Sequence, residues 1–176
     1  MSLPIPAGTY GIDPVHSQLG FSVSHLGISL VHGTFDVFSG SLTVGSTLDD
    51  TAVTISAEMA SVNSGNSMRD QHVHGAEFFD VATHQQMTFT STSIRAAESG
   101  YQMTGDLTIK GITQPVDLQV VFNGSATFPM DQSTHYGFGA TATISRSAFD
   151  ISYGVPMVSD DVELRLDVQF VQPATP

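Results

Sequence analysis

Apolar and polar residues alternate with a period of two through most of this 176-residue chain. In a β-strand, successive side chains point to opposite faces, so a period of two is typical of strands with one buried face. A helix would instead repeat its apolar residues every three to four positions. The alternation therefore predicts an all-β fold. It is clearest in the last segment, whose apolar positions are Val162, Leu164, Leu166, Val168 and Phe170.

Further alternating segments bring the expected number of antiparallel strands to about eight. Segments 101–109 and 116–122 are connected by residues 110–113, a length suited to a hairpin. In segment 31–44 the polar positions change from even to odd numbers, which predicts a β-bulge near Val37 and a sheet that curls. The apolar positions of other segments include Leu19, Phe21, Val23, Val53, Ile55, Phe138, Ala140 and Ile144.

One-sided antiparallel strands in this number close most economically into a barrel. A barrel collects the apolar faces inside and leaves no sheet edge exposed. An eight-stranded barrel can enclose one small ligand. Seven Met residues would give such an interior an adaptable lining. A solid core without a cavity explains the same periodicity, so the pattern leaves both possibilities open.

The charge balance limits the partners of this chain. Five Lys and Arg against 17 Asp and Glu give a formal net charge of −12. This acidity excludes the basic surface that nucleic acids or anionic membranes would require. Ser and Thr outnumber all charged residues and supply most outward positions of the strands. The absence of Cys excludes disulfides, thiolate metal sites and a cysteine nucleophile.

The length fits a single domain over residues 1–176, with a core of about 8–171 and a disordered tail at 172–176. Residues 1–6 contain neither the basic start nor the apolar run of a secretory signal, and no 18-residue apolar stretch occurs. As written, the chain is expected in the cytoplasm, without a transmembrane segment. Prior removal of a signal sequence would instead fit a periplasmic or secreted protein.

A short helix interrupts the strands. Residues 66–80 lack the alternation, and Asn66 or Ser67 can cap a helix of about ten residues that Gly75 interrupts or ends. The fold class expected from the residues is therefore an all-β barrel with one or two short helices.

Catalytic and metal-binding motifs are weak. His72 and His74 would share one face of a strand and could chelate a metal ion near Asp70, but on a helix they point about 200° apart. The sequence contains neither HExxH nor GxSxG. We therefore expect no catalytic residues, no metal and no cofactor. A metal-dependent hydrolase or isomerase that uses His72, His74 and Asp70 is the alternative from another functional class.

Nine short sequence blocks follow one another along the chain. They are YGIDPVHS at 10–17, FSVSHLG at 21–27, GTF at 33–35, FSG at 38–40, RDQH at 69–72, FFDV at 78–81, MTF at 87–89, GDLTIKGIT at 105–113 and SRSAFDI at 145–151. Together the blocks resemble the YceI-like family of polyisoprenoid-binding proteins, over about residues 8–171. Each block alone is weak, whereas the ordered set is highly specific.

The resemblance implies an extended lipocalin-like antiparallel β-barrel with a short helix near its mouth. Such a barrel would bind a long-chain isoprenoid or a similar amphiphilic lipid lengthwise inside: a polyprenyl phosphate, an isoprenoid quinone or a fatty amide. The protein would then be a carrier, a store or a sequestering protein, and not an enzyme. The family allows a homodimer, and many members are periplasmic or secreted. A scaffold with a solid core and surface interactions only is the third alternative.

The expected lipid-binding residues are apolar positions of the curled strands and aromatic residues that follow the helix. The head group is expected near the mouth, at His25, Arg69 and His72, although Arg69 could instead pair with Asp70 or another carboxylate. The predicted lining consists of Phe21, Val23, Phe38, Met68, Phe79, Phe89, Leu107, Leu118, Val120, Phe138 and Ile144.

Overall fold

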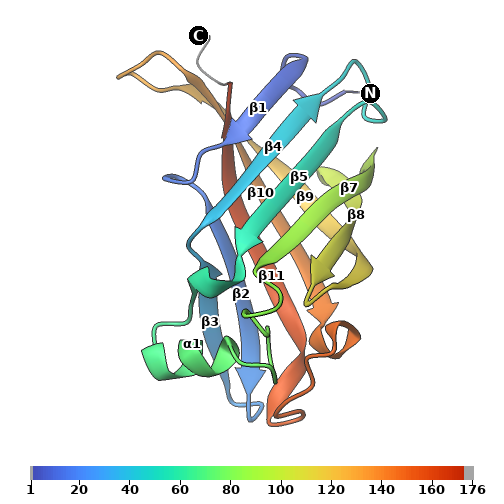
Figure 1. Cartoon of the computed structure of the whole chain (residues 1–176). Helices are drawn as coiled ribbons and strands as arrows, with labels where there is room; N and C mark the ends of the chain where they lie inside the picture. The colour runs from blue at the N-terminus through green and yellow to red at the C-terminus, as the bar shows by residue number, and fades with distance from the viewer. Residues whose placement is uncertain (1, 173–176) are drawn as a thin grey trace.

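Eleven strands dominate the computed structural model, which describes residues 2–172 (Figure 1). One α-helix, α1 (Ser67–Val73), and two 3₁₀ helices, η1 (Met59–Ser61) and η2 (Arg146–Phe149), interrupt them. The tail predicted at 172–176 lies outside the described residues, apart from its first residue. The strands are β1 (Gly8–Ile12), β2 (Gln18–His25), β3 (Ser29–Phe35), β4 (Phe38–Val44), β5 (Ala52–Glu58), β6 (Val62–Asn63), β7 (Gln86–Ala96), β8 (Tyr101–Ile109), β9 (Ile112–Thr127), β10 (Thr134–Ser145) and β11 (Val158–Val171).

Eight of these strands form a closed antiparallel barrel. Their order is β1-β4-β5-β7-β8-β9-β10-β11, and β1 closes the ring by pairing with β11. At this closure Gly11 lies opposite Val171, and Ile12 lies opposite Phe170. The prediction of an all-β, lipocalin-like barrel of about eight strands with one or two short helices is therefore confirmed.

Strands β2, β3 and β6 extend one side of the barrel wall beyond this ring (Figure 1). β2 pairs with the first part of β11, β3 pairs with β2, and β6 pairs with β3. In chain order β1 leads to β2, β3 to β4 and β5 to β6, so three long strands are each divided in two. The divided strands lengthen the wall at the end of the barrel where α1 lies.

The change of phase near Val37 is a break between two strands, whereas a bulge within one strand was predicted. β3 ends at Phe35 and β4 begins at Phe38, while Asp36 and Val37 belong to neither strand. The neighbouring strand breaks at the same level, between β5 and β6, and here the Glu58 N–H donates to the Val37 carbonyl at 2.9 Å. Facing breaks let the wall bend while its backbone groups stay hydrogen-bonded.

The apolar phase of the strands faces the barrel interior. Leu107 on β8 and Leu118 on β9 are buried, whereas Asp106 and Gln119 beside them are exposed. Full burial of a Leu side chain contributes about 1.5–3 kcal/mol relative to exposure. The interior therefore supplies the stabilising burial, and the polar phase faces solvent.

Helix α1 is shorter than predicted. The Asn66 side chain caps it, as expected, by accepting a hydrogen bond from the Arg69 N–H at 3.0 Å. The helix ends at Val73, two residues before Gly75. None of its residues is fully buried, so α1 covers one end of the barrel without entering the core.

Candidate functional site

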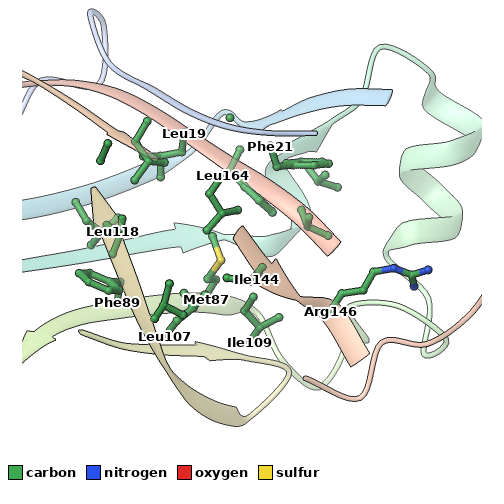
Figure 2. Close-up of a pocket in the computed structure, with 18 of the residues that line it drawn as sticks. Leu19, Phe21, Met87, Phe89, Leu107, Ile109, Leu118, Ile144, Arg146 and Leu164 are labelled. Carbon is green, nitrogen blue, oxygen red and sulfur yellow. The ribbon is translucent and has the colours of Figure 1, made fainter. Parts of the chain in front are cut away.

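A cavity of about 520 Å³, which we call the tunnel, lies inside the barrel (Figure 2). Its lining is almost entirely apolar and comes from nearly all the strands. On β11, Val158 and every second residue from Val162 to Phe170 line it. At about 3.3 Å per residue, this row follows roughly 40 Å of strand. The tunnel is therefore long and apolar enough to suit an extended hydrocarbon chain.

The N-terminal segment closes one end of the tunnel. Leu3 lines this end and, like Ile5, is only 7% exposed. The Tyr10 hydroxyl donates to the Pro6 carbonyl at 2.8 Å and so holds the segment against β1. Phe170, near the end of β11, is also buried in the lining. Apolar side chains thus separate this end from solvent.

The opposite end, which we call the mouth, is open and polar. Its lining includes His25, Arg69, His72 and Tyr153, all of which are exposed. These residues come from the end of β2, from α1 and from the loop that precedes β11. An amphiphile could leave its polar head at the mouth while its chain occupies the apolar tunnel.

Hydrogen bonds to Ser64 hold α1 at the mouth. The Arg69 Nε donates to the Ser64 hydroxyl and its Nη2 donates to the Ser64 carbonyl, both at 2.8 Å. The Asp70 carboxylate accepts from the Ser64 N–H at 2.9 Å and from the Ser64 hydroxyl. Arg69 therefore bonds to Ser64, and the alternative of an Arg69–Asp70 ion pair is not observed.

An aromatic cluster lies beside these residues at the mouth. The His72 ring meets Phe78 and Tyr153 edge-to-face, with centroids 5.1 Å and 5.2 Å apart, and its Nε2 lies 3.1 Å from the Glu77 carboxylate. The Phe78 and Tyr153 rings are 5.4 Å apart. The cluster thereby connects the region of α1 with the loop before β11.

All but two of the predicted site residues lie along the tunnel. Phe38 packs against the core, but it follows the break in the wall and does not line the tunnel. Arg69 and Val73, four residues apart on α1, face the tunnel, so Met68 points about 100° away and is 80% exposed. Ligand contact stays a prediction for every residue. The predicted residues that line the tunnel are Phe21, Val23, His25, Arg69, His72, Phe79, Phe89, Leu107, Leu118, Val120, Phe138 and Ile144.

Methionine contributes less to the lining than expected. Among the described residues, Met87 and Met103 line the tunnel. Met59 is fully buried in the core, whereas Met130 and Met157 are 86% and 60% exposed. Leu, Ile, Val and Phe therefore make up most of the tunnel wall.

Two glycines make room for Phe rings against the wall. Phe21 on β2 lies opposite Gly33 on β3, and a Cβ at Gly33 would collide with the ring. A Cβ at Gly105 on β8 would likewise collide with Phe89. Each ring therefore lies over the neighbouring strand, in space that a side chain would otherwise fill. The sequence shows both glycines, but only the strand register shows which aromatic residue each one faces.

Arg146 is a lining residue that the sequence motifs did not select. It is 6% exposed, and its guanidinium lies at one end of the tunnel (Figure 2). Burial lowers the pKa of Arg146, and the negative charge of Asp160 opposes this shift. Its guanidinium donates, at 2.8–3.0 Å, to the backbone carbonyls of Ile151, Tyr153, Val158 and Ser159.

The side chains considered for a metal site do not converge on a common point. Asp70 accepts hydrogen bonds from Ser64, His72 contacts Glu77, and Nε2 of His74 is buried without a hydrogen-bond partner. Within residues 2–172, no three His, Asp or Glu side chains are grouped to hold a metal ion. None of the helices in the same part of the chain has the length and apolar character needed to cross a membrane.

The sequence matches the model of the YceI-like domain over residues 10–170. The chain belongs to the YceI-like family. YceI-like relatives align with almost all of it. A UPF0312 protein from Ectopseudomonas mendocina is 34% identical over 170 residues, which cover 94% of this chain and 88% of that protein. The protein YceI of Salmonella arizonae is 36% identical over 171 residues, with the same two coverages of 94% and 88%.

Solved structures of other proteins share the fold. The crystal structure of BcnA from Burkholderia cenocepacia has a TM-score of 0.80 at 25% identity and covers 90% of this chain and 98% of its own. A Campylobacter jejuni YceI structure has a TM-score of 0.74 at 29% identity, with coverages of 85% and 89%. A polyisoprenoid-binding domain from Saccharophagus degradans has a TM-score of 0.72 at 18% identity, with coverages of 93% and 98%. This last likeness concerns the fold alone.

Proposed function

We propose that this YceI-like protein binds a long-chain isoprenoid or a similar amphiphilic lipid inside the tunnel. The chain would lie along the apolar lining, and the head group would lie at the mouth, near His25, Arg69 and His72. The protein would act as a carrier, a store or a sequestering protein. The observation that carries the proposal is the continuous apolar lining between a closed end and a polar mouth.

Burial of the hydrocarbon chain can supply the binding energy. Each buried methylene contributes about 0.8 kcal/mol, so a chain of several five-carbon units outweighs an association cost of about 4–15 kcal/mol. A charged anchor is not required. A polyprenyl phosphate, an isoprenoid quinone and a fatty amide all present oxygen atoms that Arg69 or a His at the mouth can meet. The Saccharophagus degradans domain, which shares the fold, is described as polyisoprenoid-binding, and the proposal extends that ligand class to this chain.

Organic extraction of freshly purified protein, followed by mass spectrometry, tests the proposal. We expect about one lipid with a long unbranched or isoprenoid chain per protein molecule. As a control, the same lipid should be absent from an unrelated acidic protein that is purified in parallel from the same cells. A protein that contains no lipid and binds none on incubation with prenyl alcohols, quinones or fatty amides would contradict the proposal.

Ala140→Phe is expected to weaken the binding of long chains selectively. Ala140 lines the tunnel on β10, between Val120 and Leu166 of the neighbouring strands, nearer to the closed end than to the mouth. A Phe ring there would displace two to four methylenes, which costs about 1.5–3 kcal/mol and corresponds to a 10- to 100-fold weaker affinity. Titration with prenyl alcohols of increasing length measures this loss of affinity. Short prenyl alcohols should bind the variant and the unmodified protein equally well.

Thr141→Phe is the matched control, because Thr141 is exposed on the outer face of the same strand. It should bind prenyl alcohols of every length like the unmodified protein. Equal losses in Ala140→Phe and Thr141→Phe would mean that the chain does not occupy the deep part of the tunnel.

A further inference from the structure

Two loops beside the mouth, which we call the mouth loops, expose large apolar side chains. They comprise residues 26–30, which form the turn after β2 and the first two positions of β3, and residues 152–157, before β11, and both lie at the α1 end of the barrel (Figure 1). Six of the eleven large hydrophobic side chains that residues 2–172 expose belong to these loops. The six are Leu26, Ile28, Leu30, Tyr153, Val155 and Met157.

The backbone holds the mouth loops in place and joins them. The Leu26 N–H donates to the Met157 carbonyl at 2.7 Å, so the two loops lie side by side. The N–H of Val158, the first residue of β11, donates to the Gly154 carbonyl at 2.9 Å and so closes the second loop. Arg146 binds the second loop from inside, through carbonyls on either side of its turn. The apolar side chains therefore form a preformed surface.

The mouth loops carry no charged residue, although the whole chain has a net charge of −12. They also adjoin the tunnel directly, because Tyr153 and the neighbouring His25 line its mouth. An apolar, uncharged patch of this kind marks an interaction site. A ligand that enters or leaves the tunnel must pass beside it.

We propose that the mouth loops dock this protein onto the surface of a zwitterionic lipid bilayer and insert their apolar side chains among the lipids. The proposal rests on the proposed function, since it describes how a membrane lipid would reach the tunnel. Docking lets the hydrocarbon chain pass from bilayer to tunnel without crossing water, where its burial would be lost. Side chains at two adjacent loop tips suit shallow insertion at the bilayer interface.

The charge of the protein selects the kind of bilayer. Lys and Arg next to an interfacial apolar surface would favour anionic lipids, and the mouth loops contain neither. The net charge of −12 opposes approach to an anionic surface. A second copy of this chain is the competing occupant of the patch, but its docking would cover the mouth and obstruct ligand exchange.

Single tryptophan residues can report docking, because the chain contains no Trp. Met157→Trp places the reporter in a mouth loop, and Met130→Trp places a control, at a position that is even more exposed, in the β9–β10 loop at the far end of the barrel. With phosphatidylcholine vesicles, we expect a blue shift of the emission and protection from a water-soluble quencher for Met157→Trp alone. No shift in either variant, or equal shifts in both, would overturn the proposal.

Ile28→Ser in the Met157→Trp protein tests the apolar contact itself. We expect at least a tenfold loss of affinity for phosphatidylcholine vesicles, while the amount of lipid extracted from the purified protein stays the same. At low salt, the protein should bind phosphatidylglycerol vesicles more weakly than phosphatidylcholine vesicles, and added salt should restore this affinity. A basic membrane-binding surface would show the reverse salt dependence. Unchanged affinity after Ile28→Ser, or strongest binding to anionic vesicles at low salt, would overturn the proposal.

Lipid extraction and vesicle binding test the proposed function and the docking surface separately. A lipid-free protein that still inserts Met157→Trp into vesicles contradicts the proposed function and leaves the docking surface standing. A lipid-filled protein that ignores vesicles contradicts the docking surface alone. A third outcome would assign the mouth loops to a second copy of the chain and overturn bilayer docking. In that case the blue shift would depend on protein concentration in the absence of vesicles, and analytical ultracentrifugation would show a dimer that Ile28→Ser dissociates.

Discussion

Leu118→Asp should prevent the chain from forming a stable, lipid-filled barrel. Leu118 is 6% exposed and lies opposite Met103, which also lines the tunnel. An aspartate there would be surrounded by apolar side chains without a partner. The cost of an uncompensated buried charge, about 3–5 kcal/mol, is comparable to the total stability of about 5–15 kcal/mol of a typical domain. Urea unfolding and lipid extraction from any folded fraction measure the effect, and we expect that fraction to contain no lipid.

Gln119→Asp is the control for this substitution. Gln119 is the next residue on β9 and is exposed, so its change to Asp should alter the free energy of unfolding by less than about 0.5 kcal/mol. Phe21→Asp, at a tunnel-lining position on β2, should behave like Leu118→Asp. A Leu118→Asp protein with normal stability and a full complement of lipid would show that the chain binds its lipid somewhere other than in the tunnel.

The sequence predicts the interior of the barrel well because alternation is a local signal. Leu107, Leu118 and Val120 occupy the apolar phase of their strands, and the pleat alone turns them to the same face. The cap at Asn66 is equally local, since it depends on residues within one helical turn. For such residues, the pattern and the structure agree.

Features that depend on contacts between distant segments are not visible in the pattern. The break at Asp36 and Val37 requires a facing break before β6, and one strand alone does not distinguish it from a bulge. The closed end of the tunnel combines Leu3, from the N-terminal segment, with Phe170, near the end of β11. The outward direction of Met68 depends on how α1 rotates on the barrel, which its seven residues do not specify.

Arg146 could have been found by extending the alternation one step. It has the same even-numbered phase as Phe138, Ala140 and Ile144, all of which line the tunnel. The phase therefore directs a charged residue into an apolar interior. Such a placement is tolerated only when hydrogen bonds satisfy the charge, and the four carbonyls that meet this need come from the chain that follows.

Arg146→Met is expected to lower the free energy of unfolding by about 3–5 kcal/mol, because it removes four charge-assisted hydrogen bonds and leaves carbonyls without donors. Methionine keeps the length and apolar stem of the side chain, so the tunnel wall stays filled. The loop at 152–157 should lose its fixed geometry, which a faster amide hydrogen exchange there would show. Urea unfolding gives the change in stability.

Arg165→Met is the matched control, since the Arg165 side chain is 80% exposed and its Nε lies 3.5 Å from the Asp167 carboxylate. An exposed ion pair of this kind contributes at most about 1 kcal/mol. If Arg146→Met were no more destabilising than Arg165→Met, the carbonyls would be satisfied without the guanidinium and the second mouth loop would not depend on it. The opposite result would be a much larger loss of unfolding free energy for Arg146→Met than for Arg165→Met, with faster amide hydrogen exchange confined to residues 152–157. It would mean that one buried charge both completes the tunnel wall and holds the apolar surface beside its mouth.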